Sequence, residues 1–122
     1  MEKLIISPTT NLLIPIKPLS VNKAWKGRRF RSKEYDEYEA DCFRLIMLIK
    51  GRAKVEGDVE IHYKFYLTQF GKMDCSNLIK LLEDILVKSE LIEDDRKVIR
   101  FSAEKFRAKE DRVEIEIKSY GN

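Results

Sequence analysis

Apolar and polar residues alternate along three segments of the chain, and each segment is predicted to form a strand. In 59–68 every second residue from Val59 to Leu67 is apolar, as in a strand with one buried face. Residues 98–106 and 112–118 alternate in the same way, and we expect them to pair as a hairpin through residues 108–111. The short apolar run 12–16, closed by prolines, indicates a further strand.

Two other segments repeat apolar residues at a spacing of three and four, which predicts helices. The first, 33–50, follows Ser32, a residue type that caps helices, and ends before Gly51. The second, 77–88, carries an apolar stripe formed by Leu78, Leu81, Leu82, Ile85 and Leu86. Residues 18–31 are expected to form a loop. Together these elements predict an α+β fold, one small mixed sheet of about four strands with two helices.

Length and composition favour one globular domain over residues 1–122. The chain has 122 residues, of which 43% are hydrophobic and 37% charged, a balance typical of folded proteins. No apolar run approaches the roughly 18 residues that span a bilayer, and the apolar start is too short for a secretion signal. We therefore expect a cytoplasmic protein without membrane contact. Its two cysteines, Cys42 and Cys75, form no metal-binding or disulfide framework.

The charges are distributed unevenly, although the formal net charge is only +3. Residues 7–33 contain no acid but seven bases, whereas acids gather at 83–84 and 93–95. The basic segment 7–33, which we call the basic arm, together with these grouped acids suits an enzyme that binds a polyanion and a cation. Trp25 and Phe30 lie within the arm, and their rings are available to stack on DNA bases. The predicted DNA contacts are Lys23, Lys26, Arg28, Arg29 and Arg31, with Lys72 further along; a merely solvated loop is the alternative.

The segment 72–80 places an acid, a hydroxyl and an amide at the entry of the second helix, with Lys80 one turn inside. Asp74, Ser76 and Asn77 are all common at helix N-termini, so capping alone can account for them. An ordinary ion pair with Glu83 or Asp84, at helical spacing, likewise accounts for Lys80.

Chain length allows a second interpretation of these residues. A 12-residue helix advances about 18 Å, and the seven residues 89–95 can span about 23 Å back, which allows Asp95 to reach a strand end beside Asp74. Clustered carboxylates repel each other unless a cation binds between them. Mg²⁺ prefers oxygen ligands and activates water against phosphodiesters, so the pair is a candidate metal site, and Lys80 a candidate contact for the scissile phosphate.

These residues resemble the RusA-like Holliday-junction resolvases. Members carry an acidic segment with Asn-Leu and a lysine that opens a helix, then an Asp-Asp pair and a terminal pair of strands. The matching parts here are 74–80, with the lysine six residues after the first acid, and Asp94-Asp95. Upstream, 18–25 is similar to the family's early proline-to-asparagine segment. The resemblance covers roughly residues 14–118.

The resemblance implies a homodimer that cuts four-way DNA junctions with Mg²⁺ as cofactor. It assigns the metal to Asp74 and Asp95, with Asp94 and Ser76 as further candidate ligands, and gives Lys80 an essential cationic role. Ser76 stands where the family's second acid is expected, and a neutral hydroxyl contributes less to a Mg²⁺ site. A protein that binds branched DNA without cutting it is therefore the alternative function.

Overall fold

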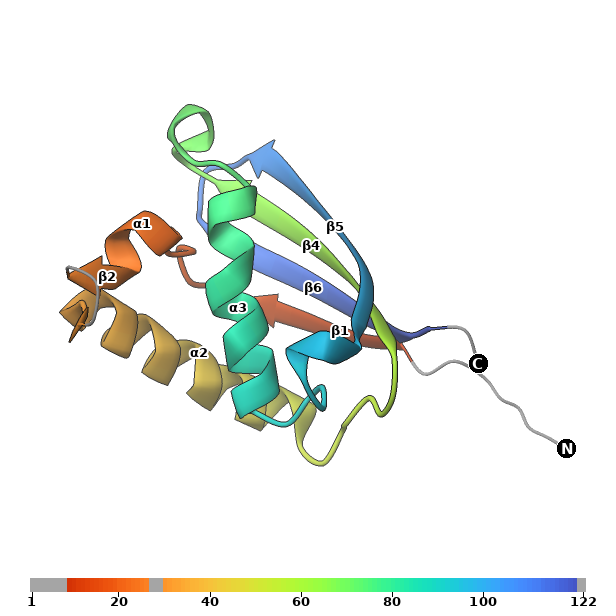
Figure 1. The fold of residues 1–122 in the computed structure, drawn as a ribbon. Helices are drawn as coiled ribbons and strands as arrows, with labels where there is room; N and C mark the ends of the chain where they lie inside the picture. The colour runs from red at the N-terminus through yellow and green to blue at the C-terminus, as the bar shows by residue number, and fades with distance from the viewer. Residues whose placement is uncertain (1–8, 27–29, 121–122) are drawn as a thin grey trace, which may run out of the picture.

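The computed structural model describes residues 9–26 and 30–120, and its central strand is β4 (Val59–Leu67) (Figure 1). Every second side chain of β4 is buried, as the alternation predicts. On one edge β4 pairs antiparallel with β6 (Arg112–Ser119), and on the other it pairs parallel with β5 (Val98–Arg107). β1 (Thr9–Ile14) pairs antiparallel with β6. The strand order is therefore β1-β6-β4-β5.

The hairpin predicted between residues 98–106 and 112–118 is absent, because β4 lies between β5 and β6. The alternation in sequence identified both strands but not their neighbours, since it indicates which side chains face the core and not which strand lies alongside. β5 is an edge strand, and few of its side chains are shielded from solvent. β6 has neighbours on both sides and buries Val113, Ile115 and Ile117.

Two long helices, α2 (Lys33–Lys50) and α3 (Ser76–Lys88), cover one face of the sheet (Figure 1). The predicted stripe of α3 is buried in full, and each such Leu or Ile contributes about 1.5–3 kcal/mol to folding. α2 buries Tyr35, Tyr38, Cys42 and Ile46, whereas Ile49, whose spacing continues the apolar pattern, is exposed. The α+β fold class and the mixed four-stranded sheet are confirmed. None of the described helices is both long and apolar enough to cross a membrane.

The predicted loop 18–31 contains short regular elements. They are α1 (Val21–Ala24), β2 (Trp25–Lys26) and β3 (Phe30–Arg31), and the last two pair with each other. Two single turns of 3₁₀ helix, η1 (Phe70–Lys72) and η2 (Asp95–Lys97), precede and follow α3 along the chain. β1 ends at Ile14 rather than residue 16, because Pro15 has no amide N–H to continue the ladder.

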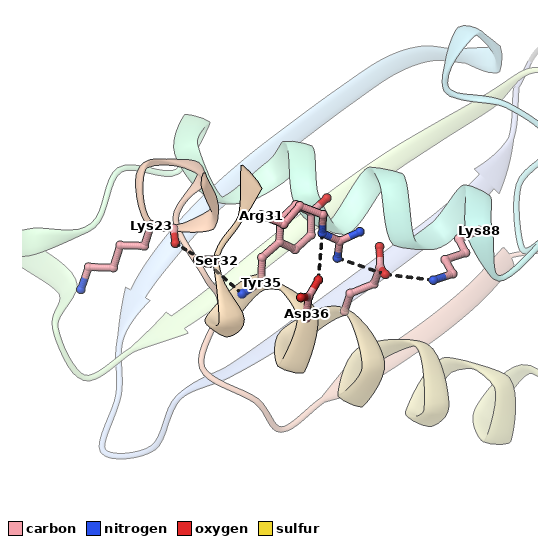
Figure 2. A network of polar contacts seen from close by, with 7 residues as sticks. Lys23, Arg31, Ser32, Tyr35, Asp36 and Lys88 are labelled. Carbon is pink, nitrogen blue, oxygen red and sulfur yellow. Dashed lines mark hydrogen bonds and ion pairs between the residues drawn. The ribbon is translucent and has the colours of Figure 1, made fainter. Parts of the chain in front are cut away.

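The two long helices begin differently. Ser32 caps α2: its Oγ accepts a hydrogen bond from the Tyr35 amide at 3.1 Å and donates one to the Lys23 carbonyl at 2.8 Å (Figure 2). α3 has no side-chain cap, and its capping position is taken by Cys75 in a helical conformation. Ser76 is already the first helical residue, so the capping role predicted for its hydroxyl is wrong.

This difference leads to a prediction for stability. Ser32→Ala should lower the free energy of unfolding by about 1 kcal/mol, because the Tyr35 amide loses its acceptor. Ser76→Ala is the matched control, a serine at the start of a helix with no capping bond, and should cost less than about 0.5 kcal/mol. Urea denaturation of both variants measures the two changes, and equal losses would contradict the assignment of the caps.

Candidate functional site

Three carboxylates gather beside α3, and a lysine of the same helix lies among them. Within the described part of the chain, one group of acids brings ligand oxygens within 4.8 Å of one another, namely Glu83, Asp84 and Asp95. The Lys80 Nζ lies 3.2 Å from Asp84, 3.4 Å from Asp95 and 3.7 Å from Glu83. The three residues from α3 are about one turn apart and so share a face. Asp95 is supplied by η2, which lies alongside the helix (Figure 1).

The electrostatics of this acidic cluster (Glu83, Asp84 and Asp95) favour a cation. Burial raises the pKa of Glu83; Lys80 opposes this shift, while Asp95 and Asp84 add to it. The hydrogen bond with Asp84 raises the pKa of Lys80, so the ammonium stays charged. Gathered carboxylates are stable together only when positive charge is close, and here Lys80 supplies it.

The donor set of the acidic cluster fits a magnesium ion. Carboxylate oxygens are the ligands that Mg²⁺ binds in proteins, usually one or two of them beside water. Asp95 was predicted as a ligand, whereas Glu83 and Asp84 were not. Their spacing from Lys80 was visible in the sequence, but it indicated only an ordinary ion pair until the fold brought Asp95 to the same place.

Two other predicted ligands, Asp74 and Ser76, are not members of the acidic cluster. Asp74 is exposed at the entry of α3 and is not a member of this group. Because β5 runs parallel to β4, the chain returns from α3 towards the beginning of β4, whereas Asp74 follows the end of β4. The metal-binding role of Asp74 stays a prediction, as does that of the exposed Ser76.

Asp94 is engaged by its neighbour Arg96. Its Oδ1 accepts the Arg96 amide at 3.0 Å, and its Oδ2 accepts the guanidinium at 3.0 and 3.3 Å. These hydrogen bonds hold the pKa of Asp94 well below its usual range. Asp94 thereby caps η2, and a role in metal binding stays a prediction.

A groove of about 660 Å³ lies at the N-terminal end of α3, and we call it the entry groove. Its lining combines the early segment 16–23, the first turns of α2 and the loop before α3. It includes Asn77, three lysines and three acids, namely Lys17, Lys23, Lys72, Glu34, Glu37 and Asp74. Two parts of the resemblance that are distant in sequence, 18–25 and 74–80, thus meet at one surface. Asn77 lines the groove and lies about one helical turn from Lys80. The groove is therefore separated from the acidic cluster by about one turn of α3.

Lys105 on β5 holds the loop that carries Asp74. Its Nζ donates hydrogen bonds to the carbonyls of Phe70 and Met73 at 2.8 and 2.9 Å. Its ammonium also lies 4.4 Å from the centre of the Phe70 ring, a favourable cation–π contact. No pattern in the sequence predicts this role, because it depends on β5 lying beside the end of β4.

The basic arm is described only in part. Arg28 and Arg29 lie outside the described residues, and Lys26 belongs to β2. Arg31 pairs with Asp36 and Glu39, both at 3.1 Å, and its guanidinium lies 3.8 Å from the centre of the Tyr35 ring (Figure 2). This residue therefore fastens the arm to α2. Its predicted DNA contact, like those of the other arm residues, stays a prediction.

A groove that carries lysines, one helical turn away from a cluster of carboxylates, is compatible with an enzyme that acts on nucleic acids. Residues 15–118 match the model of a protein family described as endodeoxyribonuclease RusA. The chain belongs to this family of nucleases, as the resemblance in sequence indicated. A search of curated proteins found no match.

Glu39 ties the arm to both long helices, and its ionisation should affect stability. Burial raises the pKa of Glu39, but hydrogen bonds from Lys88 (2.9 Å) and Arg31 (3.1 Å) outweigh it and leave the pKa below its usual value. A lowered pKa means that the stabilisation exists above the pKa of the unfolded chain and disappears as the pH falls through the folded value.

Glu39→Gln should therefore cost about 1 kcal/mol at pH 7. The cost should shrink progressively below about pH 4, where the unfolded carboxylate takes up its proton. Urea denaturation between pH 7 and pH 3 measures this trend. Glu37→Gln, at an exposed position of the same helix, serves as the control. A cost that does not change with pH would contradict the ion-pair interpretation.

Proposed function

We propose that this protein resolves four-way DNA junctions by Mg²⁺-dependent hydrolysis of phosphodiester bonds, acting as a homodimer. The observation that carries the proposal is the meeting of Lys80 and Asp95. They lie 3.4 Å apart, in a chain that matches the RusA endodeoxyribonuclease family over residues 15–118. The resemblance in sequence, which does not depend on this distance, implies that both residues belong to the active site.

Each part of the site has a role in such a reaction. Asp95, Glu83 and Asp84 would hold the ion, and Asp74 would add a carboxylate at the entry of α3. A bound Mg²⁺ supplies Lewis-acid activation of water and neutralises charge on the phosphate. The ammonium of Lys80 is suited to stabilise the negative charge that develops on the phosphate oxygens.

The entry groove is the proposed path of the DNA strand. Lys17, Lys23 and Lys72 line it, and lysines bind phosphates without regard to sequence. Lys26, Arg28, Arg29 and Arg31 of the arm would extend this contact. Recognition through the backbone suits an enzyme that selects a branched shape rather than a base sequence.

Cleavage of a synthetic four-way junction in Mg²⁺ tests the function. Asp95→Asn and Asp74→Asn should each slow cutting by more than about 100-fold, beyond the loss expected for an outer-shell partner. Binding should persist or tighten, because a negative charge near the phosphates is removed. Glu90→Gln, an exposed acid outside the acidic cluster, should cut at the normal rate.

Two outcomes would change the interpretation. Full cleavage by either aspartate variant would contradict the assignment of that residue. A wild-type protein that binds junctions but never cuts them would instead favour the alternative of a branched-DNA-binding protein, with Ser76 in place of an acid.

The outer face of α2 is the proposed dimer interface. Phe43, Met47 and Leu48 lie around a hollow of about 560 Å³ between α2 and the end of α3, and Leu48 is 75% exposed. A junction has two-fold symmetry, and paired cuts need two sites, which a two-fold dimer supplies. Antiparallel packing of two α2 helices about residue 44 would place Leu48 of one copy against the small Ala40 of the other.

The charges of α2 suit the same packing. Its first half carries five acids within residues 34–41, whereas its second half, residues 42–50, contains two bases and no acid. An antiparallel arrangement brings the acidic half of one helix near the basic half of the other, so the face is complementary to itself.

Leu48→Asp should therefore convert the dimer to a monomer, because a charge in the apolar centre of an interface is costly to desolvate. Sedimentation velocity at micromolar concentration distinguishes 14.4 kDa from twice that mass. Leu13→Asp introduces the same charge at an exposed leucine of β1 and should leave the dimer intact. The reverse result would place the interface on the sheet.

A further inference from the structure

Lys80 occupies the position in the acidic cluster that a metal ion would need. Its Nζ lies within 3.7 Å of an oxygen from each of the three carboxylates, and those ligand oxygens lie within 4.8 Å of one another. One ammonium thus forms ion pairs with three carboxylates. Of the three negative charges of the carboxylates, the ammonium neutralises one, whereas a divalent cation in its place would neutralise two.

A second feature is a buried hydroxyl within the electrostatic range of the acidic cluster. Tyr63 of β4 is fully buried, and its hydroxyl has no hydrogen-bond partner among the described residues. Burial raises the pKa of this hydroxyl, and the charges of Glu83 and Asp84 raise it further, so the phenol lies within their electrostatic reach. A buried hydroxyl without a partner is unusual in a folded protein.

The lysine is able to leave this position. Its side chain is 55% exposed, its stem has four flexible carbons, and its ion pairs with Asp84 and Asp95 are of the exposed kind that are individually weak. A divalent cation among the same oxygens would repel the ammonium and compete for its acceptors. The two cations therefore bind one set of carboxylates in alternation.

We propose that Lys80, Glu83, Asp84 and Asp95 form a cation-exchange site, in which the ammonium neutralises the carboxylates until a divalent cation displaces it. This inference rests on the proposed function and extends it in one respect: Lys80 competes with the metal for the carboxylates of Glu83, Asp84 and Asp95. The displaced ammonium stays within reach of the site, where a phosphate of the DNA is its next partner. Charge on Lys80 thus becomes available to the substrate only when the metal is bound.

Binding of Mn²⁺, a paramagnetic substitute for Mg²⁺, tests the exchange without DNA. The free ion is counted by electron paramagnetic resonance during titration of the full-length protein. Lys80→Gln should bind Mn²⁺ about fivefold more tightly than the wild type, the factor that corresponds to the loss of one exposed ion pair. Lys80→Arg, which keeps the charge, should show no such gain.

Lys88→Gln is the matched control for the removal of a charge. It takes one positive charge from the same helix, but Lys88 pairs with Glu39 at 2.9 Å and not with the acidic cluster. Its affinity for Mn²⁺ should therefore equal that of the wild type. Glu83→Gln and Asp84→Asn should each weaken Mn²⁺ binding about fivefold or more, whereas Glu90→Gln should not. Circular dichroism verifies that each variant is folded.

The results separate this inference from the proposed function. Equal or weaker Mn²⁺ binding by Lys80→Gln would overturn the exchange, as would unchanged binding in both Glu83→Gln and Asp84→Asn, and neither result depends on nuclease activity. If the exchange is observed but the wild type cuts no junction, the proposed function fails and the cation site remains.

Discussion

The structure depends on one strand, β4, which pairs with two neighbouring strands and packs against two helices. β4 pairs with β5 on one edge and β6 on the other, while its alternate side chains, fully buried, form the floor on which α2 and α3 pack. A shift of register by one residue would turn all of these side chains to the opposite face. The alternation of β4 therefore fixes the register of the sheet and, through the loop that follows, the place where α3 begins.

α3 turns this packing into a site. Its apolar stripe is held against the sheet, so the opposite side of the helix is fixed in orientation, and Lys80, Glu83 and Asp84 are presented together without a loop to position them. Because β5 must start beside the start of β4, η2 comes to lie along the same helix and brings Asp95. The core thus determines the geometry of the acidic cluster, although none of its members belongs to the core.

Residue patterns along the chain predicted the elements much better than their arrangement. The bounds of α2, the central strand and the stripe of α3 follow from periodicity, because local spacing determines which side chains one face shares. The pairing of β5 with β4 could not be read in this way, since a parallel neighbour leaves no local signal. The same limit explains the site: Asp95 and Lys80 were recognised individually, but Glu83 and Asp84 acquired meaning only when the topology brought Asp95 to them. The helix was predicted to begin at residue 77, after Ser76 as its cap, but it begins at Ser76 itself. The sequence missed this because a cap depends on backbone conformation as well as residue type.

The position of β6 has a consequence for how the chain is made. β6 lies between β1 and β4 and is hydrogen-bonded to both, yet it is the last of the four strands to leave the ribosome. Until residues 112–119 have been synthesised, β1 has no partner in the sheet, and one edge of β4 has exposed amides and carbonyls. Contacts between such distant segments form slowly, and unpaired apolar strands associate readily with other chains. The nascent protein therefore passes through a stage in which its helices can form but its sheet cannot close, and in that interval it is most exposed to aggregation.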